Sequence, residues 1–322
     1  MSLLKLGKTN IELTKIGLGC WQFSKNKGLA GSFWPKLTDE VTNSIVDISV
    51  NSGINWFDTA ELYGWGKSEI GLSEALNKLG VDKKNNFIAT KWWPLFRCSD
   101  SIKKTIDERI SCLSGFPITL HQVHMPFGFS SIESEMNAMA DLVEQGKIKH
   151  IGVSNFNQKQ MIRAHAELQK RGLDLASNQM EYSILNRDIE FNGVLEKAKE
   201  LGISIIAYSP LAQGFATGKF HLNPEKIKNN HRLRNAKLKR HKLTIDNTRE
   251  VIDELNKIAD IHNSTPSQIA LSWLVNFNSN VFAIPGATNS TQAMDNAKAL
   301  KINLSKEEIR KLDSVSKKIR NV

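Results

Sequence analysis

The chain has 322 residues, of which 40% are apolar and 24% are charged, and this balance is typical of a globular protein with a full core. The first ten residues, MSLLKLGKTN, lack the apolar stretch of a secretory signal, and the most apolar window, ISIIAY, is too short to span a bilayer. Three cysteines without C-x-x-C spacing argue against a disulfide scaffold or a zinc site. We therefore expect a cytoplasmic protein that does not enter a membrane.

Much of the formal charge of +10 lies in an acid-free stretch between Glu225 and Asp246. Such a surplus suits anionic partners: nucleic acid, acidic lipids or a phosphorylated cofactor. The stretch has no aromatic residue on which a base could stack, so we expect no nucleic-acid partner. Two explanations stay open for it, a solvated loop or helix and a flap over a phosphate-bearing ligand. Its basic residues are Lys226, Lys228, Arg232, Arg234, Lys237, Lys239, Arg240 and Lys242.

The predicted elements alternate regularly along the chain. Two short strand-like runs around the turn signal GKTN predict a hairpin at the start. Eight apolar strand-like runs follow: KIGLGCW, INWFDTA, FIATKW, TLHQVHM, HIGVSN, ASNQMEY, ISIIAYSP and VFAIPG. Helical patterns cover 38–51, 68–79, 101–113, 131–144, 158–171, 189–201, 246–262 and 266–277, with a last helix from Ser305.

Eight strands with helices between them predict a closed parallel (β/α)8 barrel. No linker or low-complexity tract divides the sequence, so we expect residues 1–322 to form a single domain. An open dinucleotide-binding sheet is the alternative, because Gly17 and Gly19 make a partial G-x-G. Gln22 stands where the third glycine of that motif belongs, which favours the barrel.

Ionisable residues stand at or near the ends of consecutive predicted strands. Asp58 ends the second strand, Lys91 the third and His124 the fourth, and Tyr63 follows shortly after Asp58. In a barrel the carboxyl ends of the strands share one rim, where the active site lies. Each residue alone also has a structural explanation: a helix cap, a lysine reaching solvent, a core histidine or a loop aromatic. Together they predict a site that protonates a carbonyl oxygen.

Seven motifs make a family resemblance specific. In order along the chain they are FDTAELYG, ATK, HQVHMP, IGVSNF, NQMEYS, AYSPLAQG and IPGATNSTQAMDN. They span nearly the whole sequence, which resembles the aldo-keto reductase superfamily, and GLG-x-W near the start is similar to its bacterial and plant-like members. The resemblance implies a (β/α)8 barrel with an amino-terminal hairpin across the bottom.

The resemblance also implies a mechanism without a metal. Tyr63 would be the general acid in hydride transfer from a nicotinamide to a carbonyl carbon. Lys91 would lower the pKa of Tyr63, and Asp58 would hold Lys91 in place. His124 would orient the substrate carbonyl.

A second set of residues is implied to hold the coenzyme. Ser154, Asn155 and Gln179 would bind the carboxamide, and Tyr208 would stack on the nicotinamide ring. The full set is Gly19, Cys20, Trp21, Asp58, Ser154, Asn155, Gln179, Tyr208, Ser209, Pro210, Leu211, Gly214, Lys219, Ile284, Gly286, Ala287, Thr288, Gln292 and Asn296.

The adenosine end departs from the family pattern. Thr288 and Asn289 are neutral, and Gln292 stands where some relatives have arginine, although a phosphate prefers cationic partners. NADPH is the expectation on family grounds, with NADH as the rival. The substrate would meet an aromatic rim of Trp21, Trp34, Trp65, Trp92 and Phe127.

Two functions follow from the resemblance. The first is an NADP-dependent reductase of small aldehydes and ketones, active as a monomer or a weak homo-oligomer. The second is a cofactor-binding regulatory subunit similar to potassium-channel beta subunits, with slow or vestigial reductase activity.

Overall fold

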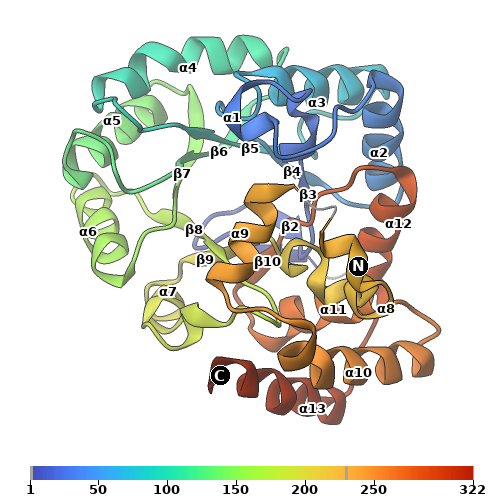
Figure 1. The fold of residues 1–322 in the computed structure, drawn as a ribbon. Helices are drawn as coiled ribbons and strands as arrows, with labels where there is room; N and C mark the ends of the chain where they lie inside the picture. Colours follow the sequence, from blue (N-terminus) through green and yellow to red (C-terminus); the bar gives the residue numbers. More distant parts are fainter. Residues whose placement is uncertain (1–2, 229–230, 322) are drawn as a thin grey trace.

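The computed structural model describes residues 3–228 and 231–321, and within them eight parallel strands form the main sheet (Figure 1). Each strand pairs with the next one along the chain, and the ring is closed by bridges from Ile16 to Ala283 and from Gly19 to Gly286. The predicted (β/α)8 barrel is therefore confirmed. The strands are β3 (Leu18–Gly19), β4 (Trp56–Asp58), β5 (Phe87–Trp92), β6 (Ile118–Val123), β7 (Ile148–Ser154), β8 (Leu175–Glu181), β9 (Ser204–Tyr208) and β10 (Val281–Ala283).

Helices surround the strands, and their first turns show why they begin where they do. The Thr38 hydroxyl accepts a hydrogen bond from the Val41 amide, and Asn157, Thr244 and Thr265 form capping boxes. The long helices are α2 (Asp39–Asn51), α3 (Lys67–Lys78), α4 (Asp100–Cys112), α5 (Ile132–Glu144), α6 (Gln158–Gln169), α7 (Val194–Leu201), α10 (Ile245–Ile261), α11 (Pro266–Phe277), α12 (Ser290–Lys298) and α13 (Lys306–Lys317).

One predicted helix is shorter than expected. The pattern over 189–201 predicted a continuous helix, but α7 begins only at Val194. Gly193 has a φ of 81°, a left-handed conformation that breaks the helical path, and Asp188–Glu190 form a separate 3-10 turn.

The hairpin closes the end of the barrel where the strands begin. Its strands, β1 (Leu3–Lys5) and β2 (Glu12–Thr14), are antiparallel. Leu6 and Leu13 are buried in a cluster with side chains from the barrel interior, such as Phe282. The Gly7 amide donates to Ser204 Oγ at 2.7 Å, and only glycine fits there, because a Cβ atom would lie 2.6 Å from a backbone oxygen at a φ of 57°.

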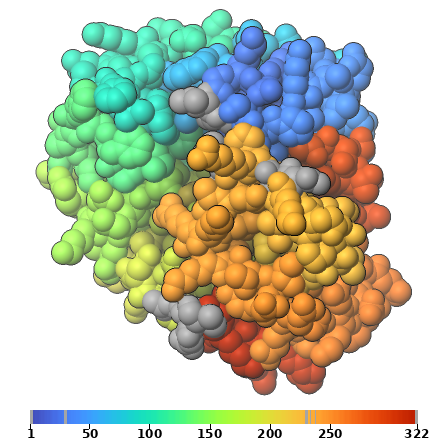
Figure 2. Space-filling view, viewed as in Figure 1, coloured from blue at the N-terminus to red at the C-terminus, as the bar shows by residue number. Residues whose placement is uncertain are grey.

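The opposite end of the barrel carries the connection between β9 and β10. It contains the 3-10 segment η3 (Ala212–Thr217), the short helix α8 (Lys219–Leu222) and the basic helix α9 (Arg232–Arg240). In Figure 1, α9 lies in front of the strands, and Figure 2 shows this segment in orange on the face of the molecule. The acid-free basic stretch therefore lies above the barrel rather than in a remote loop.

No helix in the described ranges is both long and apolar enough to cross a membrane.

Candidate active site

A cavity of about 660 Å³ opens at the carboxyl ends of the strands, opposite the hairpin. Asp58 at the end of β4, Ser154 at the end of β7 and Tyr208 at the end of β9 all line it. Because parallel strands point their last residues to one rim, residues far apart in the sequence meet here.

A buried ion pair forms the floor of this cavity. Lys91 Nζ lies 2.5 Å from Asp58 Oδ1, and it also donates to the Thr59 carbonyl at 2.8 Å. The other carboxylate oxygen, Asp58 Oδ2, accepts from Gln179 Nε2 at 2.8 Å and from Gln122 Nε2 at 3.3 Å. Burial lowers the pKa of Lys91 while Asp58 opposes that shift, so the pair keeps a cation fixed under the cavity.

Tyr63 is held over this pair by the loop after β4. Its ring centroid lies 5.0 Å from Lys91 Nζ, 5.7 Å from the His124 ring in an edge-on arrangement, and 5.7 Å from the stacked Trp21 ring. The loop can fold back this far because Gly64 has a φ of 72° and a Cβ there would lie 2.4 Å from the Ser24 carbonyl oxygen. The structure therefore brings the four predicted catalytic residues together.

The electrostatics of Tyr63 differ from the sequence-based expectation. Burial and the nearby Asp58 carboxylate raise the pKa of Tyr63 well above its usual range, rather than Lys91 lowering it. The reason is that Lys91 is neutralised by Asp58 at contact distance, so the pair offers the phenol little net positive charge. Burial and Lys91 hold the pKa of His124 well below its usual range. At neutral pH the site therefore presents a protonated phenol and a neutral imidazole.

Beside this cluster, three polar side chains and one backbone carbonyl form a connected wall. Tyr208 Oη donates to Asn155 Oδ1 at 2.8 Å, Asn155 Nδ2 donates to Ser154 Oγ at 3.0 Å, and Ser154 Oγ donates to the Gln179 carbonyl at 3.0 Å. Asn155 is held at a φ of 61°, which asparagine tolerates better than most residues. These hydrogen bonds hold the wall together, and its groups can donate to and accept from an amide.

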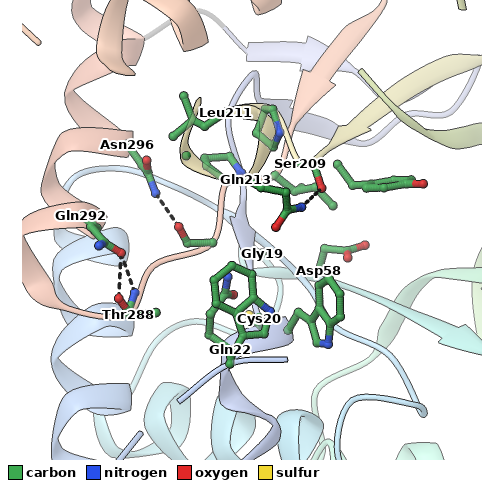
Figure 3. Close-up of a pocket in the computed structure, with 18 of the residues that line it drawn as sticks. Gly19, Cys20, Gln22, Asp58, Ser209, Leu211, Gln213, Thr288, Gln292 and Asn296 are labelled. Atoms are coloured by element: carbon green, nitrogen blue, oxygen red, sulfur yellow. Dashed lines mark hydrogen bonds between the residues drawn. The ribbon is translucent and has the colours of Figure 1, made fainter. Parts of the chain in front are cut away.

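The loop after β9 adds backbone curvature and positive charge. Ser209, Ala212, Gln213 and Gly214 all have φ values between 47° and 94°, and Gln213 Nε2 donates to Ser209 Oγ at 2.8 Å (Figure 3). Such runs of left-handed residues form concave anion-binding backbone and often mark functional sites.

Two cations line the cavity next to this loop. Lys219 and Arg234 are the basic residues among its described lining residues, and no ion pair joins either of them to an acid of the described chain. Burial lowers the pKa of Lys219, and the neighbouring Arg234 and Lys226 lower it further. Two uncompensated cations side by side suit an anion such as a pyrophosphate.

The far end of the cavity, at α12, has no basic side chain among its described lining residues, and its polar groups bind one another (Figure 3). The Thr288 amide and hydroxyl both donate to Gln292 Oε1, at 2.8 and 3.1 Å. Asn296 Nδ2 donates to the Gly286 carbonyl at 3.3 Å. Asp295 also lines this end and accepts from Gln268 at 3.0 Å.

Every residue predicted to hold the coenzyme lines the cavity with one exception. Ala287 was expected to contact it, but its side chain is buried in the core behind the loop. The predicted residues in the lining are Gly19, Cys20, Trp21, Asp58, Ser154, Asn155, Gln179, Tyr208, Ser209, Pro210, Leu211, Gly214, Lys219, Ile284, Gly286, Thr288, Gln292 and Asn296.

Of the five residues predicted for the substrate rim, two line the cavity and three do not. Trp21 and Trp34 line the cavity. Trp92 does not, because its indole is buried between the barrel and α4, where Nε1 donates to Ser101 Oγ at 3.0 Å. Trp65 and Phe127 are exposed outside the cavity lining, with 55% and 41% of their surface accessible.

Sequence reasoning missed three glutamines. Gln22 and Gln213 line the cavity, and Gln122 binds the Asp58 carboxylate. Gln122 left a signal in the sequence, because a polar residue two positions before His124 in an apolar strand shares its inward direction.

Unpaired buried polar atoms show that the cavity is shaped for a polar ligand. Gln22 Oε1, Trp34 Nε1 and Arg234 Nε are buried and have no hydrogen-bond partner within the described part of the chain. Together with the uncompensated cations and the fixed amide wall, they fit a nicotinamide dinucleotide, whose carboxamide, pyrophosphate and ribose groups need such partners.

Comparisons with known proteins agree with this geometry. Residues 15–317 match the model of the Aldo/keto reductase family. A probable aldo-keto reductase from Glycine max is 30% identical over 96% of this chain and 87% of its own length. The crystal structure of a thermostable aldo-keto reductase, Tm1743, solved with the inhibitor epalrestat, is 30% identical, covers 98% of this chain and 100% of its own, and has a TM-score of 0.78. The structure of an aldo/keto reductase from Klebsiella pneumoniae in complex with NADP and acetate shares the fold, at 24% identity over 97% of this chain and 94% of its own, with a TM-score of 0.73.

The fold and the match to the family model define an oxidoreductase built on a (β/α)8 barrel. The chain belongs to the aldo-keto reductase family.

Proposed function

We propose that this protein reduces the carbonyl group of small aldehydes or ketones to an alcohol, with a reduced nicotinamide dinucleotide as the hydride donor. The observation that carries the proposal is the position of Tyr63. Its phenol lies at the cavity, against the Lys91–Asp58 pair on one side and His124 on another. This arrangement places a phenolic proton donor at the cavity, where general acid catalysis of carbonyl reduction requires one.

When bound, the coenzyme supplies a hydride to the carbonyl carbon. Tyr63 donates its proton to the carbonyl oxygen as negative charge develops there, and its raised pKa ensures that the proton is present at neutral pH. Lys91 lies close enough to the Tyr63 ring to offset part of the negative charge of the phenolate that remains, even though Asp58 balances much of its own charge. The neutral His124 is placed to hydrogen-bond the carbonyl oxygen and orient it. Asp58 fixes the lysine between these steps.

The remaining lining residues support a coenzyme role in three zones. Ser154, Asn155 and Gln179 would hold the carboxamide. The backbone of 209–214 with Lys219 would bind the pyrophosphate, and the segment 286–296 would meet the adenosine. NADPH is our proposal on family grounds, and direct titration with NADPH and NADH decides between the two.

The substrate is proposed to enter beside Trp21 and Trp34, which narrow the cavity next to Tyr63. This aromatic wall suits planar or hydrophobic carbonyl compounds.

The test compares the parent protein with Tyr63→Phe, which removes one oxygen and keeps the ring. The parent should consume reduced coenzyme when a reactive aldehyde is added, followed by absorbance. Tyr63→Phe should lose about 10²- to 10⁴-fold in turnover while it binds coenzyme as tightly as the parent. Equal turnover in both proteins would disprove the role of Tyr63. A parent that binds coenzyme tightly but reduces no aldehyde in a broad panel would support a regulatory subunit instead.

A further inference from the structure

Arg234 on the basic helix α9 lies between two walls of the cavity. Its guanidinium carbon is 4.6 Å from the Trp34 ring centroid, so the flat face of the group stacks on the indole. One amino group donates to the Gln213 carbonyl at 3.0 Å, within the curved loop after β9. The helix therefore reaches from the loop after β9 to the loop after β3.

The hydrogen-bonding capacity of Arg234 is largely unused. A guanidinium has five N–H donors in one plane, and stacking occupies only its face. Its Nε atom is buried and has no hydrogen-bond partner among the described residues, although the side chain lines the cavity. Lys219 lies so close to Gly214 in that loop that a Cβ there would be 2.8 Å from Lys219 Nζ, and it forms no ion pair with the described acids. The two negative charges of a pyrophosphate would satisfy both cations, and no carboxylate on the described chain does so.

From Trp34, which stacks on the guanidinium of Arg234, a series of aromatic contacts leads to the predicted proton donor. Trp34 packs edge-on against Trp21 at 5.9 Å, and Trp21 stacks on Tyr63 at 5.7 Å. Phe33 also stacks on Trp21, at 4.7 Å, and lies 5.5 Å from the His231 ring just before α9. The loop that forms the substrate wall therefore contacts this segment at two points, at Arg234 through Trp34 and at His231 through Phe33.

We infer that Arg234 is a positioning residue that joins the phosphates of the bound dinucleotide to the aromatic wall of the substrate pocket. Its N–H edge binds the phosphates and its face holds Trp34, so coenzyme binding orders the wall against which the carbonyl compound packs. Coenzyme and substrate therefore bind with positive coupling. This inference rests on the proposed function, because it needs a dinucleotide in the cavity.

The first measurement is the coenzyme dissociation constant, followed by quenching of protein fluorescence. Arg234→Ala should weaken binding by roughly ten- to a hundredfold, the range for a lost charge-assisted hydrogen bond. The matched control is Arg232→Ala, which removes the same charge from an exposed position on the same helix, and it should change binding by less than about threefold because surface charges contribute little. ADP-ribose, which has the pyrophosphate but no nicotinamide, should lose affinity in Arg234→Ala as the full coenzyme does, whereas adenosine should not.

A second variant separates charge from stacking. Arg234→Lys keeps a cation for the phosphates but has no flat face for Trp34. At saturating coenzyme we expect it to recover most of the coenzyme affinity and still to show a raised KM for the aldehyde, with kcat changed less. Trp34→Ala should raise the same KM in the parent and add little in the Arg234→Ala background, because both changes break one connection.

Two outcomes would overturn the inference: Arg234→Ala binding coenzyme as tightly as the parent, or additive effects of the Arg234 and Trp34 changes on KM. These outcomes leave the proposed function intact, because the parent would still bind coenzyme and reduce aldehydes. A parent that binds neither NADPH nor NADH would overturn both.

Discussion

The two ends of the cavity are built in different ways. The end at the strand tips is made of buried charge: Asp58 and Lys91 form an ion pair, and Gln179 adds a hydrogen bond to the carboxylate. The end at α12 has no basic side chain among its described lining residues, and the donors of Thr288 already bind Gln292. One end is therefore built on a buried ion pair, while the other is built on hydrogen bonds and a single acid, Asp295. The positive charge available to a ligand lies between them, at Lys219 and Arg234.

Under the proposed function, this contrast means that catalysis and coenzyme choice are set by separate parts of the chain. The strand tips are fixed by the barrel, since each β-strand places its last residue at the rim. The α12 end depends on one loop and the first turn of one helix, which can change without disturbing the barrel. Under the proposed function, the pyrophosphate of the coenzyme would meet Lys219 and Arg234 in the middle of the cavity, whereas a 2′-phosphate at the α12 end would find no cation among the described lining residues.

The largest expected effect comes from breaking the charged end. Lys91→Met leaves the Asp58 carboxylate buried without its partner, which should cost about 3–5 kcal/mol of stability. The measurement is urea or thermal unfolding. The matched control is Lys103→Met, which breaks a partly exposed pair with Asp141 and should cost no more than about 1 kcal/mol. Similar losses of unfolding free energy in both variants would show that the buried Asp58–Lys91 pair contributes no more to stability than a partly exposed pair.

A smaller effect is expected when positive charge is added to the α12 end of the cavity. Thr288→Arg places a cation where a 2′-phosphate would lie, and it should shift the ratio of NADH to NADPH dissociation constants toward NADPH by roughly tenfold. Met294→Arg, on the helix α12 that follows Thr288 but outside the cavity lining, is the control and should leave the ratio unchanged. An unchanged ratio in Thr288→Arg would mean that the adenosine ribose lies elsewhere.

The smallest expected effect is the response to pH. Burial and Lys91 depress the pKa of His124, so this imidazole is already neutral at pH 6 and does not change as pH rises. The raised pKa of Tyr63 keeps its proton in place throughout the same range. We therefore expect kcat/KM for reduction to stay nearly constant from roughly pH 6 to pH 9. A step in kcat/KM near pH 6.5 would contradict the prediction that His124 is neutral. A fall in kcat/KM between pH 7 and 9 would contradict the prediction that Tyr63 stays protonated.

The strand tips could be predicted from the sequence because their positions follow from periodicity. An apolar run that ends in Asp58, Lys91 or His124 places each of these residues at one rim, whatever the loops do. The same periodicity also explains the error at Trp92. Successive side chains in a strand point to opposite faces, so once Lys91 points into the barrel, Trp92 must point into the helix layer.

Other parts of the site could not be derived in this way. Trp65 and Phe127 lie on loops, whose direction depends on tertiary packing rather than on a repeat. The raised pKa of Tyr63 needs the depth of burial and the contact between Asp58 and Lys91, which no spacing encodes. Likewise, the sequence shows a basic stretch, but only the structure shows that, among its described residues, Arg234 alone lines the cavity.

The closure of the barrel has a consequence for synthesis. The first strand meets the last through bridges at Ile16 and Gly19 to residues 283 and 286. A nascent chain emerging from the ribosome cannot complete this ring until nearly all of it has been translated. Until then β3 exposes an unpaired edge, which is a hazard for aggregation. The first and the last strands to be translated must therefore pair before the cavity at the strand ends is complete.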